Sequence, residues 1–261
     1  MKIKKAYKFR LKTTPEIESK LWIFAGHSRF VWNYFWHINK RRLANKQRIM
    51  RYNEMDFWSK ILKSSNEYGF FKEAQAHIIQ QKLKDLDKAY KDGFDKKQPY
   101  KRLPVKKKKF KSTNSFRFPE PKQFKVSDKR IKIPKIGWIS FFKSRDIKGI
   151  PKNITISYSS GHWYVSIQVE QEIVVPVNNN TAVGIDLGIK SFAVTSTPFK
   201  DTVHKSISSF NAIRSKLAIQ QRKLKNKKKF SNNWNKQKCK IQKIHTKAVN
   251  IRKDVRSKMK V

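Results

Sequence analysis

Acidic side chains are scarce in this sequence. Its 261 residues include 18 Asp and Glu against 62 Lys and Arg, which leaves a formal net charge of +44. Positive charge at this density repels itself unless a polyanion is nearby, so a free metabolic enzyme or an acid-binding module is not expected. Yet 38% of the residues are hydrophobic and 13% aromatic, more than a disordered basic tail carries. The composition therefore indicates a folded protein that binds nucleic acid.

Cysteine is almost absent. The single Cys239 excludes an intramolecular disulfide framework and an all-Cys zinc site. We therefore expect no zinc in this chain, and we expect the protein to occupy a reducing compartment. No stretch approaches the roughly 18 consecutive apolar residues of a membrane-spanning helix, and residues 1–10 lack the apolar core of a signal peptide. We expect a cytoplasmic or nucleoid-associated protein with no membrane partner.

The first hundred residues predict one strand followed by helices. Residues 1–12 alternate apolar and basic side chains, which is typical of a strand with a basic outer face. Thr14, Pro15 and Glu16 form a helix start, and apolar residues at steps of three and four extend that helix to about residue 42. A second helix is expected to start at Asn53. A third, ending near Gly93, carries an apolar face made of Ile79, Leu83, Leu86 and Tyr90.

The composition changes near residue 96. Residues 97–111 hold eight Lys and Arg and no acid, and Pro99 and Pro104 interrupt any helix. Strand-like segments follow, with a hairpin turn at 159–161; they lie at 115–118, 122–126, 130–133, 138–142, 154–158 and 162–169. A first strand, a helical insertion and then a sheet predict an α+β protein in which a helical lobe interrupts a small β-barrel.

A linker containing Pro176 and Asn178 to Asn180 precedes the last part of the chain. Two apolar runs flank residues 187–190, so we expect a hairpin with Asp186 pointing inward. Residues 211–261 contain 18 Lys and Arg and a single acid, Asp254. Their apolar spacing predicts an antiparallel helical hairpin with its turn near residues 227–233.

Asp186 admits two interpretations. A carboxylate in the apolar run G-I-D-L-G is costly to bury without a cation. It either caps a hairpin or pairs with a lysine, or it is a Mg²⁺ ligand on the first strand of an RNase H-like nuclease.

Several motifs resemble the TnpB/OrfB family of insertion-sequence proteins. GIDLGIKSFAVT looks like the first RuvC motif, and YKFRLKTTPEIESKL with HSRFVWNYFW resembles the N-terminal OrfB signature. LKDLDKAYKDGF is similar to the end of the recognition lobe, and IKIPKIGWISF and GHWYVSIQVE to second-domain strands. KLAIQQRKLKNKKK and IHTKAVNIRKDVRSKM resemble the helical hairpin after the first RuvC motif. The resemblance covers essentially the whole chain.

The resemblance implies a bacterial RNA-guided DNA endonuclease that uses Mg²⁺. It implies an oligonucleotide-binding-like wedge barrel at 1–12 and 97–180, an inserted helical recognition lobe at 13–96, and a RuvC, RNase H-like domain at 181–261. The partners implied are a guide RNA, whose pairing reads most of the sequence, and double-stranded target DNA.

The chain departs from the family pattern in its carboxylates. The family site needs an Asp, a Glu and a second Asp, with a zinc ribbon between the last two. After Asp186 this sequence has only Asp201 and Asp254 and no Glu. Asp201 belongs either to a third strand or, as we interpret it, to a loop, and we interpret Asp254 as an ion-pair partner. We expect one carboxylate to be too few for two Mg²⁺ ions. The expectation is therefore a C-terminally truncated or split protein, inactive alone, with a separately encoded second half as a partner.

Further contacts to nucleic acid are expected outside the carboxylate. The basic stretches 97–111 and 211–261 are candidates for phosphate binding, with Lys106, Lys107, Lys108 and Lys109 at the centre of the first. Arg117 is a further phosphate candidate. By resemblance, Tyr52 and Gln80 fall where the family reads the motif flanking its target; their plain interpretations are a helix-start aromatic and a surface amide.

The aromatic cluster early in the chain leaves base stacking open as an alternative to core packing. Its members are Trp22, Phe24, Phe30, Trp32, Tyr34, Phe35 and Trp36. The six histidines show no metal spacing.

A catalytically inactive RNA- and DNA-binding protein, as a remnant or a repressor, remains the alternative function. A basic RNA-packaging protein fits the composition but not the motifs.

Overall fold

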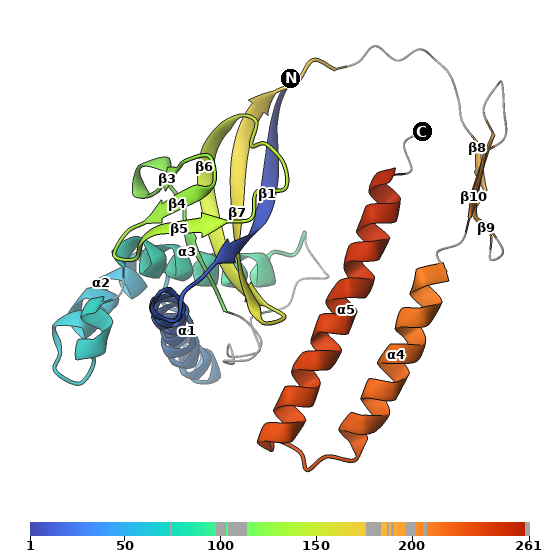
Figure 1. The fold of residues 1–261 in the computed structure, drawn as a ribbon. Helices are drawn as coiled ribbons and strands as arrows, with labels where there is room; N and C mark the ends of the chain where they lie inside the picture. Colours follow the sequence, from blue (N-terminus) through green and yellow to red (C-terminus); the bar gives the residue numbers. More distant parts are fainter. Residues whose placement is uncertain are drawn as a thin grey trace. The chain divides into compact units, whose positions relative to one another are not determined.

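The computed structural model describes residues 1–73, 75–97, 103, 114–175, 184–186, 188, 191–196, 202–205 and 208–258. The chain divides into two compact units, Met1–Val174 and Val175–Val261 (Figure 1). The first unit combines an antiparallel sheet with a group of helices, and the second combines a small sheet with a helical hairpin. The fold class is therefore α+β.

Seven strands form the sheet of the first unit. They are β1 (Lys2–Lys12), β2 (Ser115–Phe118), β3 (Lys125–Val126), β4 (Arg130–Ile133), β5 (Gly137–Phe141), β6 (Ile150–Ser159) and β7 (His162–Glu172). The order is β2-β6-β7-β1-β5-β4-β3, and every pair is antiparallel. Between its ends at β2 and β3 this order stays open, so the structure does not show the closed barrel that the sequence predicts.

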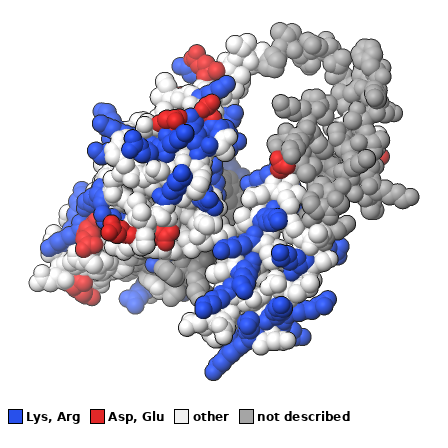
Figure 2. All heavy atoms as spheres, in the orientation of Figure 1, with Lys and Arg blue, Asp and Glu red and all other residues white. Residues whose placement is uncertain are grey.

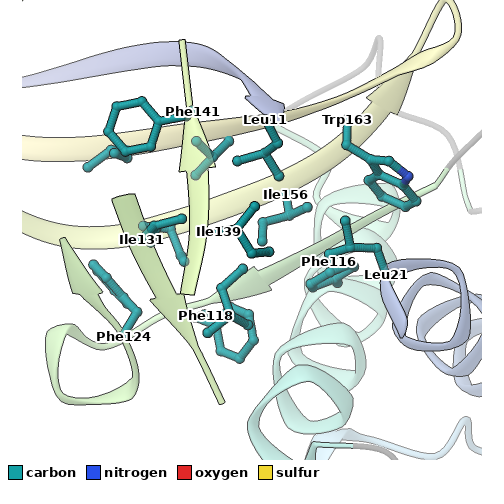
Figure 3. Close-up of a cluster of buried hydrophobic side chains, with 14 of the residues drawn as sticks. Leu11, Leu21, Phe116, Phe118, Phe124, Ile131, Ile139, Phe141, Ile156 and Trp163 are labelled. Carbon is teal, nitrogen blue, oxygen red and sulfur yellow. The ribbon is translucent and has the colours of Figure 1, made fainter. Parts of the chain in front are cut away.

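The strand β1 joins the two halves of this sheet. Residues 2–10 pair with β7, whereas Leu11 and Lys12 pair with β5. Apolar side chains from both halves point toward one another in a single core, as Figure 3 shows for Leu11 of β1, Ile139 of β5 and Ile156 of β6. The period of two in these strands places their apolar residues on this face and their polar residues on the other.

The predicted strands are confirmed with small differences. Residues 122–126 form a short 3-10 turn, η2 (Pro121–Gln123), before the two residues of β3. Ser160 and Gly161, which connect β6 to β7, have φ of 51° and 88°. Positive φ at both central positions is the geometry of the type I′ hairpin turn, and it explains why Ser-Gly follows the strand here.

Three helices form the lobe between β1 and β2. They are α1 (Pro15–Ala44), α2 (Tyr52–Ser64) and α3 (Ala76–Phe94), with a 3-10 turn η1 (Gly69–Glu73) before α3. Thr14 caps α1 by accepting a hydrogen bond from the N–H of Ile17, as the sequence predicts. The first half of α1 packs on the sheet through Leu21, and the second half packs in a separate helical core through Phe35.

The second unit contains three short strands and two long helices. β8 (Gly184–Asp186) and β10 (Thr202–Lys205) flank β9 (Ser191–Ser196) in an antiparallel sheet. α4 (Ser208–Lys225) and α5 (Asn232–Lys258) form the predicted hairpin, in which the amide of Gln237 donates to the backbone O and to Oε1 of Gln220 at 3.0 and 2.8 Å. The strand β10 lies where the sequence left a third strand open as an alternative to a loop. No helix within the described ranges is long and apolar enough to span a bilayer.

Candidate nucleic-acid interface

A row of polar side chains crosses four strands on the outward face of the large sheet. In register, Arg117 of β2 lies opposite Thr155 of β6, Thr155 opposite Ser166 of β7, and Ser166 opposite Lys8 of β1. Their chain neighbours are buried in the core, so these four residues face away from it. The row therefore has a cation at each end and two short hydroxyl side chains between them. We call it the hydroxyl row.

A second row runs beside the hydroxyl row. Ser115, Ser157, Tyr164 and Arg10 lie opposite one another in the same strand order. The ammonium of Lys8 lies 4.6 Å from the ring centroid of Tyr164, and the guanidinium carbon of Arg10 lies 4.2 Å from that of Phe142. These contacts hold flexible cations close to aromatic faces on the outside of the sheet.

The cationic and aromatic character continues onto the other half of the sheet. Lys12 lies opposite Ser140, which in turn lies opposite Arg130. The Arg130 guanidinium carbon lies 5.6 Å from the ring centroid of Trp138, whose side chain is 46% exposed. Cations beside exposed aromatic rings suit a polynucleotide, because phosphates pair with the cations and bases stack on the rings.

Acidic residues in the sheet and in the loops beside it pair with other cations. Lys152 pairs with Glu170 at 2.9 Å and its hydrogen bond holds the pKa of that carboxyl below the usual value. Lys143 pairs with both Asp128 and Asp146, and these bonds raise the pKa of its ammonium. Lys8, Arg10 and Arg117 take no part in these ion pairs of the described residues. The positive potential of the two rows is retained.

Of the predicted phosphate contacts, Arg117 lies at the interface. Its side chain is exposed, and its Nε donates to Oγ1 of Thr155 at 3.4 Å. Lys106, Lys107, Lys108 and Lys109 lie outside the described residues. The other members of the two rows, among them Lys8, Tyr164 and Arg10, were not singled out from the sequence. The alternation of β1 pointed to its basic outer face, but the hydroxyl partners come from strands more than a hundred residues later.

Tyr52 and Gln80 lie on neighbouring helices of the lobe. Tyr52 is the first residue of α2, half-buried, and the ammonium of Lys84 on α3 lies 5.2 Å from its ring centroid. Burial, together with the charge of Asp56, raises the pKa of the Tyr52 hydroxyl. Gln80 is half-buried one helical turn before Lys84, so both residues share the side of α3 that meets the start of α2. Their role in reading a target motif stays a prediction.

Of the two interpretations of the early aromatic cluster, core packing is confirmed for its two central tryptophans and the stacking alternative is wrong for them. Trp32 and Trp36 are only 9% and 6% exposed and belong to the helical core with Phe35. Trp22 packs at 4.6 Å from Tyr158 and 5.0 Å from Trp163, as centroid distances. The lobe helices cover the face of α1 that the sequence left open, so these rings do not reach a nucleobase.

Asp186 ends β8 in the small sheet of the second unit. It lies opposite Val194 of β9, which confirms the predicted hairpin. All three residues of β8 are exposed, so the prediction that Asp186 points inward is wrong. The apolar run around it does not place it in a core, because β8 is a short strand at the edge of a three-stranded sheet. The desolvation argument for a cationic partner therefore does not apply.

The described residues do not fit a Mg²⁺ site. Within them no group of three His, Cys, Asp or Glu side chains is close enough to share a metal ion. A hard divalent cation held by protein needs several oxygen ligands, and Asp186 alone supplies one carboxylate. Asp254 is exposed on α5, and Asp201 lies outside the described residues.

The helical hairpin of the second unit is the other cationic surface. In Figure 2, Lys and Arg side chains run along both helices. The two helices pack through buried residues on their facing sides, with Ile213 and Ile241 each 8% exposed. Most of the hairpin surface is therefore free to carry charge. A sheet with a cationic outward face and a cationic helical hairpin define the class: an α+β protein with two strongly positive surfaces.

Comparison with known proteins then gives the family. A model described as "Probable transposase" (OrfB_IS605) matches residues 164–260, and one described as "Helix-turn-helix domain" (HTH_OrfB_IS605) matches residues 1–48. The chain belongs to the OrfB/TnpB family. Over residues 1–48 the structure forms the strand β1 and the single long helix α1.

Two curated relatives align with nearly the whole chain. "Putative RNA-guided DNA endonuclease InsQ" of Escherichia coli (strain K12) is 37% identical over 255 residues, which are 97% of this chain and 62% of the relative. "Putative RNA-guided DNA endonuclease" of Streptomyces pristinaespiralis is 28% identical over 261 residues, 98% of this chain and 63% of the relative. The chain therefore spans less than two thirds of the length of either.

One solved structure also aligns with most of the chain. It is described as "Cryo-EM structure of the Cas12f1-sgRNA-target DNA complex", with a TM-score of 0.48 and 12% identity. The alignment covers 97% of this chain and 76% of that one.

Proposed function

We propose that this chain binds a guide RNA and double-stranded target DNA and belongs by function to the RNA-guided DNA endonucleases. The observation that carries the proposal is its alignment, over 97% of its own length, with the E. coli relative of that description. The outward face of the large sheet supports it physically, because the hydroxyl row lets a phosphate backbone come close between Lys8 and Arg117.

The proposal divides the chain by task. The seven-stranded sheet acts as the wedge domain, corresponding to 1–12 and 97–180, and the helices of 13–96 act as the recognition lobe. Residues 181–261 provide the first strands and the helical hairpin of a RuvC-type domain. In this arrangement Asp186 is exposed, as a residue that meets a substrate must be.

DNA cleavage requires more carboxylates than this chain supplies after Asp186. The sequence has no Glu beyond that point, and the described residues form no metal-binding group. We therefore propose that Mg²⁺-dependent cleavage occurs only when further carboxylates are supplied in addition to these 261 residues. By itself the chain binds without cutting.

The lack of further carboxylates after Asp186 also favours a second function. A chain that holds RNA and DNA without completing a metal site acts as a catalytically inactive binding protein that occludes its target. The first function predicts a complementing polypeptide that restores cleavage, and the second predicts that none does.

The test uses the purified full chain and the RNA transcribed next to its gene. Affinity for this RNA and for a scrambled RNA of equal length is measured from about 50 to 200 mM salt, the range over which purely electrostatic binding falls steeply. We expect the preference for the native RNA to persist at high salt. Equal affinity for both RNAs at every salt concentration would contradict guide binding.

Cleavage is assayed with the same complex, target plasmid and Mg²⁺. We expect no cleavage by the chain alone, and cleavage after addition of a polypeptide bearing the later family motifs. Cleavage by the chain alone that disappears in Asp186→Ala would overturn the requirement for additional carboxylates.

A further inference from the structure

The tip of the helical hairpin presents an aromatic residue to solvent. Phe230 lies in the turn between α4 and α5, and its side chain is 70% exposed. Its φ is 70°, in the left-handed region that bulky residues rarely adopt. A large apolar ring is thus both uncovered and placed in an unfavourable backbone conformation.

Hydrogen bonds hold this turn in one geometry. The side-chain amide of Asn235 donates to the backbone O of Phe230 at 3.1 Å. Ser231 caps α5 by accepting from the N–H of Trp234 at 3.1 Å, and its own N–H donates to the O of Lys228 at 3.2 Å. The backbone of the turn that carries Phe230 is therefore held by the cap.

Phe230 and Trp234 form an aromatic pair at the tip. Their ring centroids lie 5.5 Å apart at an interplanar angle of 55°. Such a contact between the residue before a helix cap and the first turn also fixes how the chain enters the helix. That local contact covers only part of Phe230, which stays 70% exposed.

Lysines surround the pair. The ammonium of Lys229 lies 5.8 Å from the Phe230 centroid, and that of Lys238 lies 5.1 Å from the Trp234 centroid. Residues 225–240 contain seven lysines and no acid. An open aromatic face within this charge complements a ligand that carries both a planar ring and a phosphate.

We propose that the Phe230–Trp234 tip is a stacking site for an unpaired nucleobase of a bound polynucleotide. The open face of Phe230 stacks on the base, while Lys229 and Lys238 contact the phosphates on either side. This inference rests on the proposed nucleic-acid binding and deepens it, because it names an unpaired base as the group that the second unit recognises.

The test is a double-mutant cycle with the full chain. One ligand is an RNA hairpin with a single bulged adenine, and its matched control carries an abasic site at that position. Affinities are measured for wild type, Phe230→Ala, Phe230→Leu and Phe230→Tyr. Leucine keeps an apolar contact to Trp234 but has no flat ring, whereas tyrosine keeps the ring. The same pair of ligands in DNA tells whether the base comes from RNA or from DNA.

We expect Phe230→Ala and Phe230→Leu to weaken binding of the bulged ligand roughly 5- to 150-fold, the range measured for base–aromatic stacking. Phe230→Tyr should bind like wild type, and all four proteins should bind the abasic ligand equally. The salt dependence should not change, because no phosphate contact is lost.

Other outcomes contradict the inference. If Phe230→Ala weakens both ligands equally, or neither, no base stacks on the ring. If Phe230→Leu binds as well as Phe230→Tyr, the contact to Trp234 is structural. If wild type binds neither ligand in RNA or DNA, the stacking site is ruled out. The proposed function is tested separately, by the affinity for the RNA transcribed next to the gene.

Discussion

The guanidinium carbon of Arg10 lies 4.2 Å above the ring of Phe142, and the backbone N–H of Phe142 donates to the carbonyl O of Arg10 at 2.9 Å. The two residues are far apart in the chain and meet where β1 passes from one half of the sheet to the other. The contact keeps a cation on the outward face at this junction. It links the packing of the sheet directly to the surface that we propose for nucleic acid.

Removing the two cations that end the hydroxyl row tests that surface. If Lys8 and Arg117 each contact a phosphate, Lys8→Gln and Arg117→Gln should each reduce the slope of log K against log salt by about 0.7 to 0.9, and the double variant by about twice that. The measurement is RNA affinity by anisotropy over a salt series. Lys20→Gln, on the exposed side of α1, makes the same charge change away from the sheet face. An equal loss of slope in that control would show that only net charge matters.

Replacing Asp186 separates a functional role from a structural one. Because Asp186 is exposed, Asp186→Asn should change the free energy of unfolding by no more than about 0.5 kcal/mol. The same variant should abolish any cleavage obtained with a complementing polypeptide. Glu120→Gln removes the charge of an exposed acid that makes no side-chain cap hydrogen bond, and it should leave both properties unchanged. Thermal unfolding and plasmid cleavage measure the two effects, and a strongly destabilised Asp186→Asn would show that the carboxylate is structural.

Asn39 is expected to be the most sensitive polar residue of the helical lobe. It is fully buried, its amide donates to the O of Met50 at 3.1 Å, and its Oδ1 accepts from the N–H of Met50 at 2.8 Å. Asn39→Ala leaves both backbone groups of Met50 buried without that partner, which should cost about 2 to 5 kcal/mol.

Urea unfolding followed by tryptophan fluorescence measures this loss, because six of the seven tryptophans lie in the first unit. Asn45→Ala is the matched control, since Asn45 is exposed just after α1. If both variants unfold at the same urea concentration, the two hydrogen bonds between Asn39 and Met50 do not stabilise the lobe.

His27 should make the first unit sensitive to acid. Burial beside Phe70 and Phe71 lowers the pKa of its imidazole below the ordinary 6.5, more strongly than the nearby charge of Glu73 raises it. The unfolded chain therefore binds a proton first, so the stabilising contribution is complete above pH 6.5 and is lost as the pH falls through the lower, folded-state pKa.

The loss amounts to about 1.4 kcal/mol for each unit between the two pKa values. His27→Gln removes the titrating group, so its stability should fall less than that of wild type below pH 6.5. Urea midpoints at several pH values give the comparison, and parallel pH profiles for the two proteins would rule out His27 as the cause.

The strands and helices of this protein follow largely from local patterns. Alternation in residues 1–12 predicts that Tyr7, Phe9 and Leu11 face a core, and all three are buried. Thr14 and Pro15 predict the start of α1, which begins at Pro15. These predictions succeed because side-chain period and capping are properties of neighbouring residues.

Predictions that depended on what covers an element were less successful. For Trp32 and Trp36 the sequence left base stacking open beside packing against the second helix, and the helical core, which includes Met55 of α2, decides for packing. Asp186 was expected inside because its neighbours are apolar, yet β8 has too few partners to bury it. The pattern shows which residues share a face, but not whether another element covers that face.

The sequence by itself determined the excess of positive charge, the order of the elements, the family and the number of carboxylates after Asp186. Only the tertiary structure decided that Lys8, Ser166, Thr155 and Arg117 form one row, and that Phe230 stands open beside Trp234. The reason is physical. Charge and period are local to the chain, whereas a surface is made by strand register and by the caps that orient single side chains.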